Sequence, residues 1–157
     1  MSSIKRALAF ERARYDVQYF YRWLGYAWGD HIGKWMDLYT DRKGSHVHRV
    51  CIIAPRSHSK STTLGVKLLH QCLFDKYNGN PLQVWLFSAS RDTAIRRLAE
   101  IRSDLTKHPE LSRYLDTKRG GKVELYFTNG AVIRCSSVGS AIRGEHPAVI
   151  ALDDVLL

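Results

Sequence analysis

The strongest constraint on the fold is a junction at which an apolar run passes through a short polar loop into a helical pattern. Residues 47–54 are mostly apolar and rich in β-branched side chains, which predicts a buried strand. Polar residues 55–61 follow. From Lys60 onward, apolar residues recur at helical spacing: Leu64, Leu68, Leu69 and Cys72. A strand that leads through a tight loop into a helix is typical of α/β proteins.

The next segment repeats this alternation. The turn residues Asn78-Gly79-Asn80-Pro81 end the helical pattern. Residues 82–87 then predict a second strand, and residues 92–107 predict a second helix. Strands that alternate with helices indicate an α/β fold class, with a mainly parallel sheet flanked by helices.

Two further strands and a last apolar strand complete the expected sheet. Residues 123–127 and 131–135 flank Asn129-Gly130. This dipeptide supplies the two positive φ angles of a type I′ turn, so a hairpin is expected here. Residues 148–152 predict the last strand, which is buried and ends directly before two aspartates.

The N-terminal part is expected to be helical. Residues 3–24 predict one helix, and four aromatic residues recur along one face of it: Tyr15, Tyr19, Trp23 and Tyr26. Such a stripe usually packs into a core, and stacking on nucleic-acid bases is the alternative. A second short helix is expected at residues 35–39. Residues 1–45 therefore predict a helical segment that packs on a core formed by residues 46–157.

The balance of charges favours a polyanionic partner. The 157 residues include 24 Lys and Arg and 15 Asp and Glu, a formal net charge of +9. Such an excess steers association with nucleic acid or phosphates without locating a site. Cys51, Cys72 and Cys135 form no CxxC or Cys/His pair, which predicts reduced thiols in a cytosolic compartment. No apolar stretch is long enough for a membrane span, so no membrane partner is expected.

The loop before the helix predicted from Lys60 carries part of a phosphate-binding motif. A phosphate-binding loop surrounds an anion with backbone N–H groups at a helix N-terminus, and it supplies a lysine to the phosphates and a hydroxyl to Mg²⁺. Lys60 and Ser61 stand in this order. Ala54 and Ser59 occupy the two usual glycine positions, where a side chain is unfavourable in left-handed backbone. An ordinary strand-to-helix loop is the alternative.

Asp153 and Asp154 follow the last predicted strand, at the edge where α/β sheets bind ligands. Two adjacent buried carboxylates repel each other unless a cation neutralises them, and Mg²⁺ is the natural cation. On this interpretation Asp153 binds Mg²⁺ together with the Ser61 hydroxyl, and Asp154 polarises the attacking water. An Asp-Asp pair also occurs in ordinary loops, so the lysine loop is needed to support this assignment.

Two segments resemble the large subunit of tailed-phage terminases. Residues 54–62 read Ala-Pro-Arg-Ser-His-Ser-Lys-Ser-Thr, which is similar to the Walker A form Ala-Pro-Arg-Gly-His-Gly-Lys-Ser-Thr of that family. The matching residues are Pro55, Arg56, His58, Lys60, Ser61 and Thr62, whereas Ser57 and Ser59 replace glycines. Residues 140–154 resemble the stretch in which Arg-Gly-x-His-Pro precedes the Walker B strand.

Two further similarities to the same family are less specific. Ser88-Ala89-Ser90 with Ala94 resembles the motif that ends the second strand. His31 with Trp35 is loosely similar to the upstream segment that approaches adenine. All four similarities occur in the family order along the chain.

The resemblance implies a P-loop ATPase that uses ATP and Mg²⁺ to drive double-stranded DNA into a procapsid. The implied ATP-binding residues are Pro55, Arg56, Ser57, His58, Ser59, Lys60, Ser61 and Thr62. The implied metal ligands are Ser61 and Asp153, and the implied catalytic residues are Asp154 and Arg56, whose guanidinium would stabilise charge on the transferred phosphoryl group. The implied partners are the portal of the procapsid, a small terminase subunit and further copies in a homo-oligomeric ring, in the host cell cytoplasm.

A full large subunit continues with a coupling motif and an RNase H-like nuclease domain. This sequence contains neither, so it is expected to be a truncated ATPase domain that packages nothing alone. Two other functions remain open. A helicase-like or remodelling P-loop ATPase would use the same lysine and aspartates, and a noncatalytic DNA-binding or assembly module would account for the charge and the missing glycines.

Overall fold

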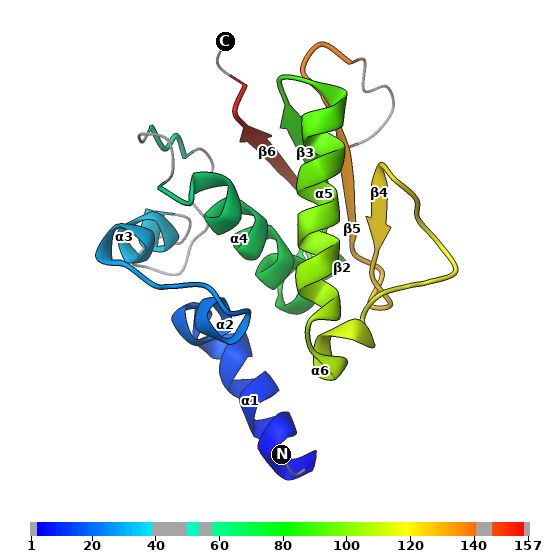
Figure 1. The fold of residues 1–157 in the computed structure, drawn as a ribbon. Coiled ribbons are helices and arrows are strands. Elements are labelled where there is room, and N and C mark those ends of the chain that lie inside the picture. Colours follow the sequence, from blue (N-terminus) through cyan, green and yellow to red (C-terminus); the bar gives the residue numbers. More distant parts are fainter. Residues whose placement is uncertain (1–2, 39–49, 54–57, 141–145, 156–157) are drawn as a thin grey trace. The chain divides into compact units, whose positions relative to one another are not determined.

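The computed structural model describes residues 3–38, 50–53, 58–140 and 146–155. The chain divides into two compact units, Met1–Thr63 and Leu64–Leu157, and each is considered by itself. The boundary expected between residues 45 and 46 lies outside the described residues. Figure 1 shows the elements of both units. Among the described helices, none combines the length and the apolar character that crossing a membrane demands.

Helices α1 (Ser3–Tyr15) and α2 (Val17–Trp23) open the first unit, where the sequence predicts a single helix over residues 3–24. Asp16 separates them because its backbone is extended, with φ −125° and ψ 92°. Its side chain accepts a hydrogen bond of 2.8 Å from the backbone N–H of Tyr19, which caps α2. The prediction of one continuous helix is therefore wrong.

The break at Asp16 also changes which aromatic residues are buried. Tyr15, the first member of the predicted core stripe, is 83% exposed. The buried residues of α2 and its end are instead Phe20, Tyr21 and Leu24. Since α2 starts a new helix, a stripe counted from Tyr15 does not continue along one face. The predicted core stripe is therefore wrong for Tyr15, whereas Tyr19, Trp23 and Tyr26 are half-buried.

Helix α3 (Asp30–Leu38) begins earlier than the helix expected at residues 35–39. Ile32 and Met36 are its buried residues. Gly33 lies inside the helix, where a Cβ would stand 3.4 Å from Cζ2 of Trp28. The glycine therefore allows the indole ring to pack closely on the helix and does not end it.

Residues 50–53 form no strand, although the sequence predicts one over residues 47–54. Cys51 is exposed and the side chain of Ile53 is 85% exposed. β-branched residues favour a strand where a neighbouring strand completes the ladder, and no described strand pairs with these residues. The predicted buried strand is wrong for residues 50–53; residues 47–49 and 54 lie outside the described residues.

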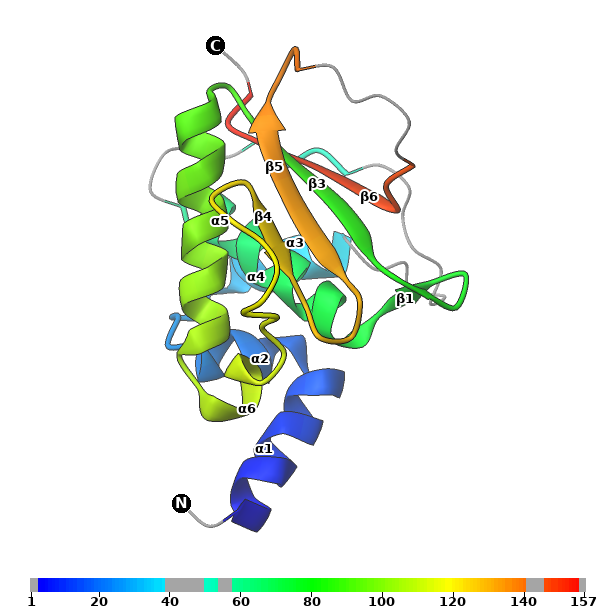
Figure 2. The same ribbon diagram turned by 90° about the vertical axis from the view of Figure 1, so that its right-hand side faces the viewer.

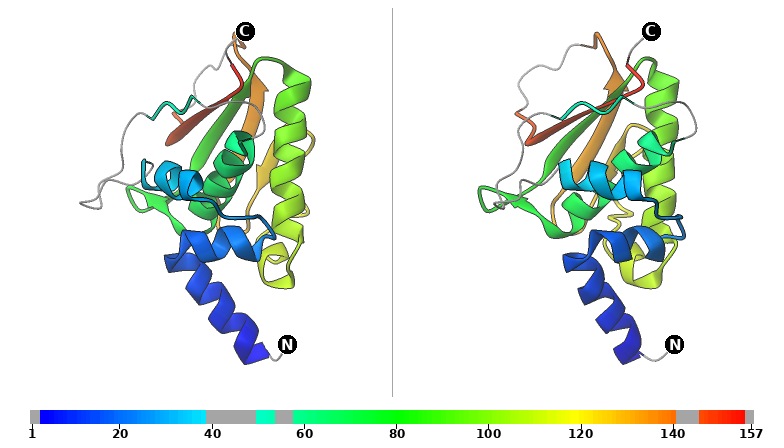
Figure 3. Two further views of the ribbon diagram at one scale, coloured as in Figure 1. Left: turned by 60° about the vertical axis from the view of Figure 1, so that its left-hand side comes forward. Right: turned by 90° about the vertical axis from the view of Figure 1, so that its left-hand side faces the viewer.

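The second unit contains a four-stranded sheet in the order β4-β5-β3-β6. Its strands are β3 (Gln83–Ser88), β4 (Glu124–Tyr126), β5 (Val132–Ser137) and β6 (Val149–Asp153). β3 pairs in parallel with both β5 and β6, and β4 pairs antiparallel with β5. Figures 2 and 3 show these strands side by side. The expected α/β class with a mostly parallel sheet is confirmed.

Two helices of this unit begin within one residue of the predicted positions, and a short third helix was not predicted. They are α4 (Lys60–Phe74), whose first turn belongs to the first unit, α5 (Arg91–Thr106) and the short α6 (Pro109–Ser112). α5 packs against β3 and β5, as Figure 2 shows. The buried residues of α5 include Ala94, Leu98, Ile101 and Leu105, and those of the sheet include Val84, Leu86, Leu125, Ile133 and Ala151. The core of this unit lies between these two sets.

One Asn-Gly pair forms a type I′ turn, but it is not the predicted one. Asn78 and Gly79 have φ angles of 50° and 78°, and they join the two-residue strands β1 (Lys76–Tyr77) and β2 (Asn80–Pro81). In the predicted hairpin, Gly130 has φ 91° but Asn129 is not in the positive-φ region.

The loop between β4 and β5 is instead a three-residue hairpin loop with a glycine bulge. The N–H of Gly130 donates to the carbonyl of Phe127 at 3.0 Å, and the N–H of Phe127 donates to Ala131 at 2.9 Å. This pattern is that of a type I turn followed by a left-handed glycine. The hairpin is thus confirmed and its type I′ turn is wrong.

Candidate functional site

The first group of candidate residues lies at the N-terminus of α4. Lys60 is the first residue of this 15-residue helix. Ser59 directly before it has a left-handed backbone, with φ 58°. The carbonyl of Ser59 accepts a hydrogen bond of 2.8 Å from the N–H of Thr63, so the helical ladder starts at once. The loop therefore adopts at Ser59 the conformation for which a phosphate-binding loop uses glycine.

The residues after Ser59 are placed by the first turn of the helix. Lys60, Ser61 and Thr62 are half-buried, and Thr63 is buried. The hydroxyl of Thr63 lies 3.5 Å from that of Tyr21. The N-terminal turn of an α-helix directs its backbone N–H groups outward and carries a partial positive charge, which favours an anion there. Pro55, Arg56 and Ser57 lie outside the described residues, and their assignment stays a prediction.

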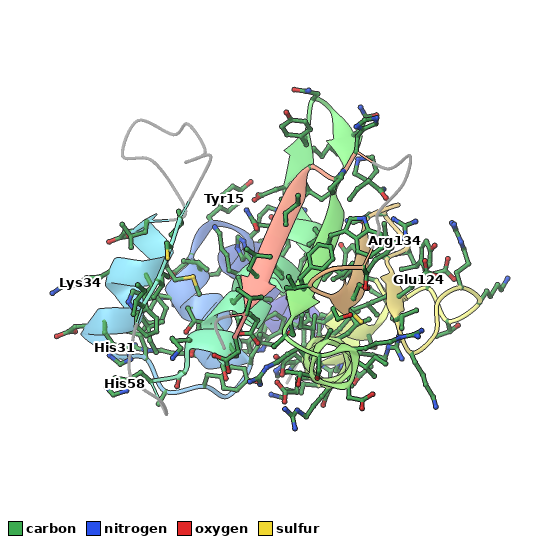
Figure 4. All side chains as sticks on the ribbon, turned by 90° about the horizontal axis from the view of Figure 1, so that it is seen from above. Tyr15, His31, Lys34, His58, Glu124 and Arg134 are labelled. Atoms are coloured by element: carbon green, nitrogen blue, oxygen red, sulfur yellow. The ribbon has the colours of Figure 1, made fainter. Side chains whose placement is uncertain are left out.

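Three aromatic rings gather beside this turn within the first unit. The ring centroid of His58 lies 6.0 Å from that of His31, and the centroid of His31 lies 5.0 Å from that of Trp35. Figure 4 shows His31 and His58 next to each other. His31 and His58 are exposed and Trp35 is half-buried. The segment that resembles an adenine-approaching motif therefore lies against the polar loop.

The second group of candidate residues lies at the carboxyl end of β6. Asp153 is the last residue of this strand and is 5% exposed. Asp154 is exposed, and its backbone is left-handed with φ 51°. The expectation of two buried carboxylates is therefore wrong for Asp154. The strand ends at Asp153, and the left-handed backbone of the next residue does not continue it.

Arg97 of α5 holds Asp153 in place, a relationship that the sequence interpretation missed. Its Nε donates to Oδ2 of Asp153 at 2.8 Å, and its Nη1 donates to Oε2 of Glu100 at 2.8 Å. Burial lowers the pKa of Arg97, but the hydrogen bonds and charges of Glu100 and Asp153 outweigh it, so the pKa lies above its ordinary value. Only the Arg97-Glu100 spacing of three residues was visible in the sequence.

Ser88 lies beside Asp153 at the same edge of the sheet. The two residues are paired in the parallel ladder of β3 and β6, so their side chains leave the sheet on the same face. Ser88 is fully buried, and its Oγ has no hydrogen-bond partner among the described residues. A buried hydroxyl without a partner is costly, and a bound water or ligand commonly satisfies such a group.

The donors at this edge fit Mg²⁺. Carboxylate and hydroxyl oxygens are the ligands that Mg²⁺ prefers, and Asp153 and Ser88 offer one of each. No three His, Cys, Asp or Glu residues come together as a metal-binding group in the described ranges. Mg²⁺ does not require such a group, because it usually keeps several waters and binds one or two carboxylates plus substrate phosphates.

Comparison with known proteins gives no match: no family model matches the sequence, and no curated protein or solved structure is significantly similar to the chain. Lys60 and Ser61 belong to the first unit, and Asp153 belongs to the second. Their common role therefore stays a prediction.

Proposed function

We propose that the chain is the nucleotide-binding part of a P-loop ATPase, of the kind that packages DNA as the large subunit of a tailed-phage terminase. The observation that carries this proposal is the left-handed backbone of Ser59, with φ 58°, directly before Lys60 at the start of α4. A serine held in this conformation is strained by about 1–2 kcal/mol. Strain at the position of the second loop glycine supports a loop shaped for phosphate.

The proposed roles follow the chemistry of phosphoryl transfer. Lys60 binds the β- and γ-phosphates of ATP, whose anionic charge is favoured at the N-terminus of α4. Ser61 and Asp153 hold Mg²⁺, which neutralises charge that develops on the phosphates. Asp154 is exposed beside the buried Asp153, so its carboxylate is accessible to an attacking water, which it orients. Arg56 is proposed to stabilise the charge of the transferred group.

The ring cluster of the first unit supports a nucleotide as the ligand. His58 lies two residues before Lys60, and the rings of His31 and Trp35 extend the aromatic surface beside it. Any nucleobase can stack on such rings, whatever hydrogen-bonding groups it carries. Base and phosphates of one nucleotide would then both contact the first unit.

A basic loop in the second unit supports double-stranded DNA as the partner. The basic loop, residues 113–122, carries Arg113, Lys118, Arg119 and Lys122, all exposed, and one acidic residue. Its ends are fixed to β4: the N–H of Asp116 donates to Tyr126 at 3.0 Å, and that of Gly121 donates to Glu124 at 3.1 Å. Exposed cations on a fixed loop neutralise phosphates and give sequence-independent binding.

Binding of ATP in the presence of Mg²⁺, measured for the parent chain and for Lys60→Ala, tests the proposed function. The variant is expected to bind ATP at least roughly tenfold more weakly, because the lysine contacts the phosphates. Lys76→Ala, a matched change at an exposed lysine of β1, is the control and should leave binding unchanged. Equal ATP affinity of the parent and Lys60→Ala would overturn the proposal.

A noncatalytic DNA-binding module is the second candidate, and the basic loop favours it independently of the nucleotide. The same titration separates the two functions. DNA binding by a chain that binds no ATP would support the module, whereas ATP binding that depends on Lys60 supports the ATPase. A helicase-like ATPase would share that dependence and would in addition unwind DNA without a procapsid.

A further inference from the structure

Arg97 lies between two carboxylates that differ strongly in burial. It donates to Asp153, whose side chain is 6% exposed, and to Glu100, whose side chain is 48% exposed. Both hydrogen bonds are 2.8 Å long, and the side chain of Arg97 is itself 23% exposed. The guanidinium is therefore shared between a carboxylate at the sheet edge and a carboxylate near solvent.

A buried carboxylate needs a counter-charge, and in this unit Arg97 supplies it. An ionised group loses hydration when it is buried, so an uncompensated Asp153 would be strongly unfavourable. A divalent cation at Asp153 would supply the same compensation. The guanidinium and the cation would then repel each other across one carboxylate, because like charges a few ångströms apart interact strongly at a partly buried site.

We propose that Arg97 is the resident counter-ion of Asp153 and that a divalent cation displaces it, while Glu100 retains the released guanidinium. This inference rests on the metal-binding role proposed for Asp153. Arg97 is then a positioning residue: it orients the carboxylate of Asp153 before the metal arrives, and it weakens metal binding until nucleotide phosphates add their charge. Glu100 sets how readily Arg97 leaves.

Ser88 completes this arrangement. Its hydroxyl is buried on the same face as the Asp153 carboxylate and has no partner among the described residues. A water in the first shell of a cation at Asp153 would satisfy it, since Mg²⁺ retains several waters that donate hydrogen bonds. Ser88 thus marks the side of Asp153 on which the cation is bound.

The test uses Mg²⁺ alone as the ligand. The thermal unfolding midpoint is measured at increasing Mg²⁺ concentrations, and its rise gives the dissociation constant of Mg²⁺. Arg97→Gln is expected to unfold at a lower temperature without Mg²⁺ and to bind Mg²⁺ roughly tenfold more tightly, because the competing charge is gone. Arg97→Lys should stay near the parent. Arg96→Gln, the same change at the adjacent exposed residue of α5, is the control for net charge.

Glu100→Gln gives an independent measurement at an exposed position, where folding is not at risk. Without the Glu100 charge, Arg97 is bound by Asp153 alone and is harder to displace. Mg²⁺ should therefore bind about twofold more weakly, which matches the small stabilisation by an exposed ion pair. Mg²⁺ affinity that is unchanged or lowered in Arg97→Gln would overturn the proposal; if that variant does not fold, an unchanged affinity in Glu100→Gln would overturn it.

Asp153→Asn tests whether Mg²⁺ binds at Asp153, and Lys60→Ala together with Arg97→Gln separates this inference from the proposed function. Asp153→Asn should abolish the Mg²⁺-dependent stabilisation in the parent and in Arg97→Gln alike. If Lys60→Ala leaves ATP binding unchanged while Arg97→Gln still tightens Mg²⁺ binding at Asp153, the ATPase fails and the counter-ion exchange stands. If ATP binding depends on Lys60 while Arg97→Gln leaves Mg²⁺ binding unchanged, the exchange alone fails.

Discussion

The side-chain amide of Asn129 donates to the backbone carbonyl of Cys72 at 2.8 Å, so the loop between β4 and β5 caps the C-terminal end of α4. The Oδ1 atom of the same side chain accepts from the N–H of Ala131 at 3.0 Å. One asparagine thereby satisfies a carbonyl that the helix leaves without an intrahelical partner and also fixes its own turn.

Asn129→Ala is expected to lower the free energy of unfolding by about 1–2 kcal/mol, because both hydrogen bonds are lost. Urea denaturation followed by circular dichroism measures the change. Asn80→Ala is the control, since the exposed side chain of Asn80 bonds only locally, to the carbonyl of Asn78 at 3.2 Å. A loss no larger than that of the control would contradict the capping role.

Ser59→Gly is expected to raise the free energy of unfolding by about 0.5–1 kcal/mol. Glycine removes the strain of a side chain at φ 58°, and part of the gain is offset because glycine loses more backbone entropy on folding. Denaturation curves measure stability, and an ATP titration of the same variant is expected to show tighter binding. Ser103→Gly, in the interior of α5, should be destabilising by a similar amount.

Reversing charge in the basic loop is expected to weaken DNA binding. Combining Lys118→Glu, Arg119→Glu and Lys122→Glu should lower affinity for a short duplex at least roughly tenfold and reduce the slope of log affinity against log salt by about three, one unit for each lost phosphate contact. The control combines Lys5→Glu, Arg6→Glu and Arg14→Glu in α1, which changes the net charge of the protein by the same amount. If both triple variants lose the same affinity for DNA, binding depends on the net charge of the protein and not on the basic loop.

Stability is expected to fall in alkaline solution because of two buried thiols. Burial raises the pKa of Cys135 from 9.0 to about 11 and also raises the pKa of Cys72. Below pH 9.0 both thiols are protonated in the folded and in the unfolded protein. Between pH 9.0 and about 11 only the unfolded protein loses these protons. The free energy of unfolding should therefore decrease with rising pH by about 1.4 kcal/mol per pH unit for each thiol.

Denaturation at pH values on either side of 9.0 measures this slope. Cys135→Ala should reduce the slope by the contribution of one thiol, whereas Cys51→Ser should leave it unchanged because Cys51 is exposed. A slope that both variants preserve would assign the alkaline sensitivity to other groups.

The elements that the sequence predicted well are those with an uninterrupted local pattern. β3, α5 and β6 each lie within about one residue of their predicted bounds, since strand and helix periodicities are read from neighbouring residues. The break at Asp16 was missed, although an Asp in front of a new helical turn is a recognisable N-cap. The prediction of a strand at residues 50–53 was wrong. β-branched residues favour a strand only where a neighbouring strand pairs with them.

The candidate site was predictable only where its residues are consecutive. Ser59, Lys60 and Ser61 take their places from one strand-to-helix junction, and the loop sequence alone indicated them. The pairing of Arg97 with Asp153 depends on the parallel register of β3 and β6 and on the packing of α5 against the sheet. The Asn129 turn likewise depends on Cys72, far away in the sequence. No local pattern carries such information.

Among the described strands, β6 pairs with β3 alone, and the side chains of Ile150 and Leu152 are 60% and 57% exposed. A strand with one open edge and an apolar outer face is a template on which another chain can add a strand. Association of the protein should consequently increase with its concentration. Dilute samples would contain single folded chains, and concentrated samples would contain chains that pair with one another through β6.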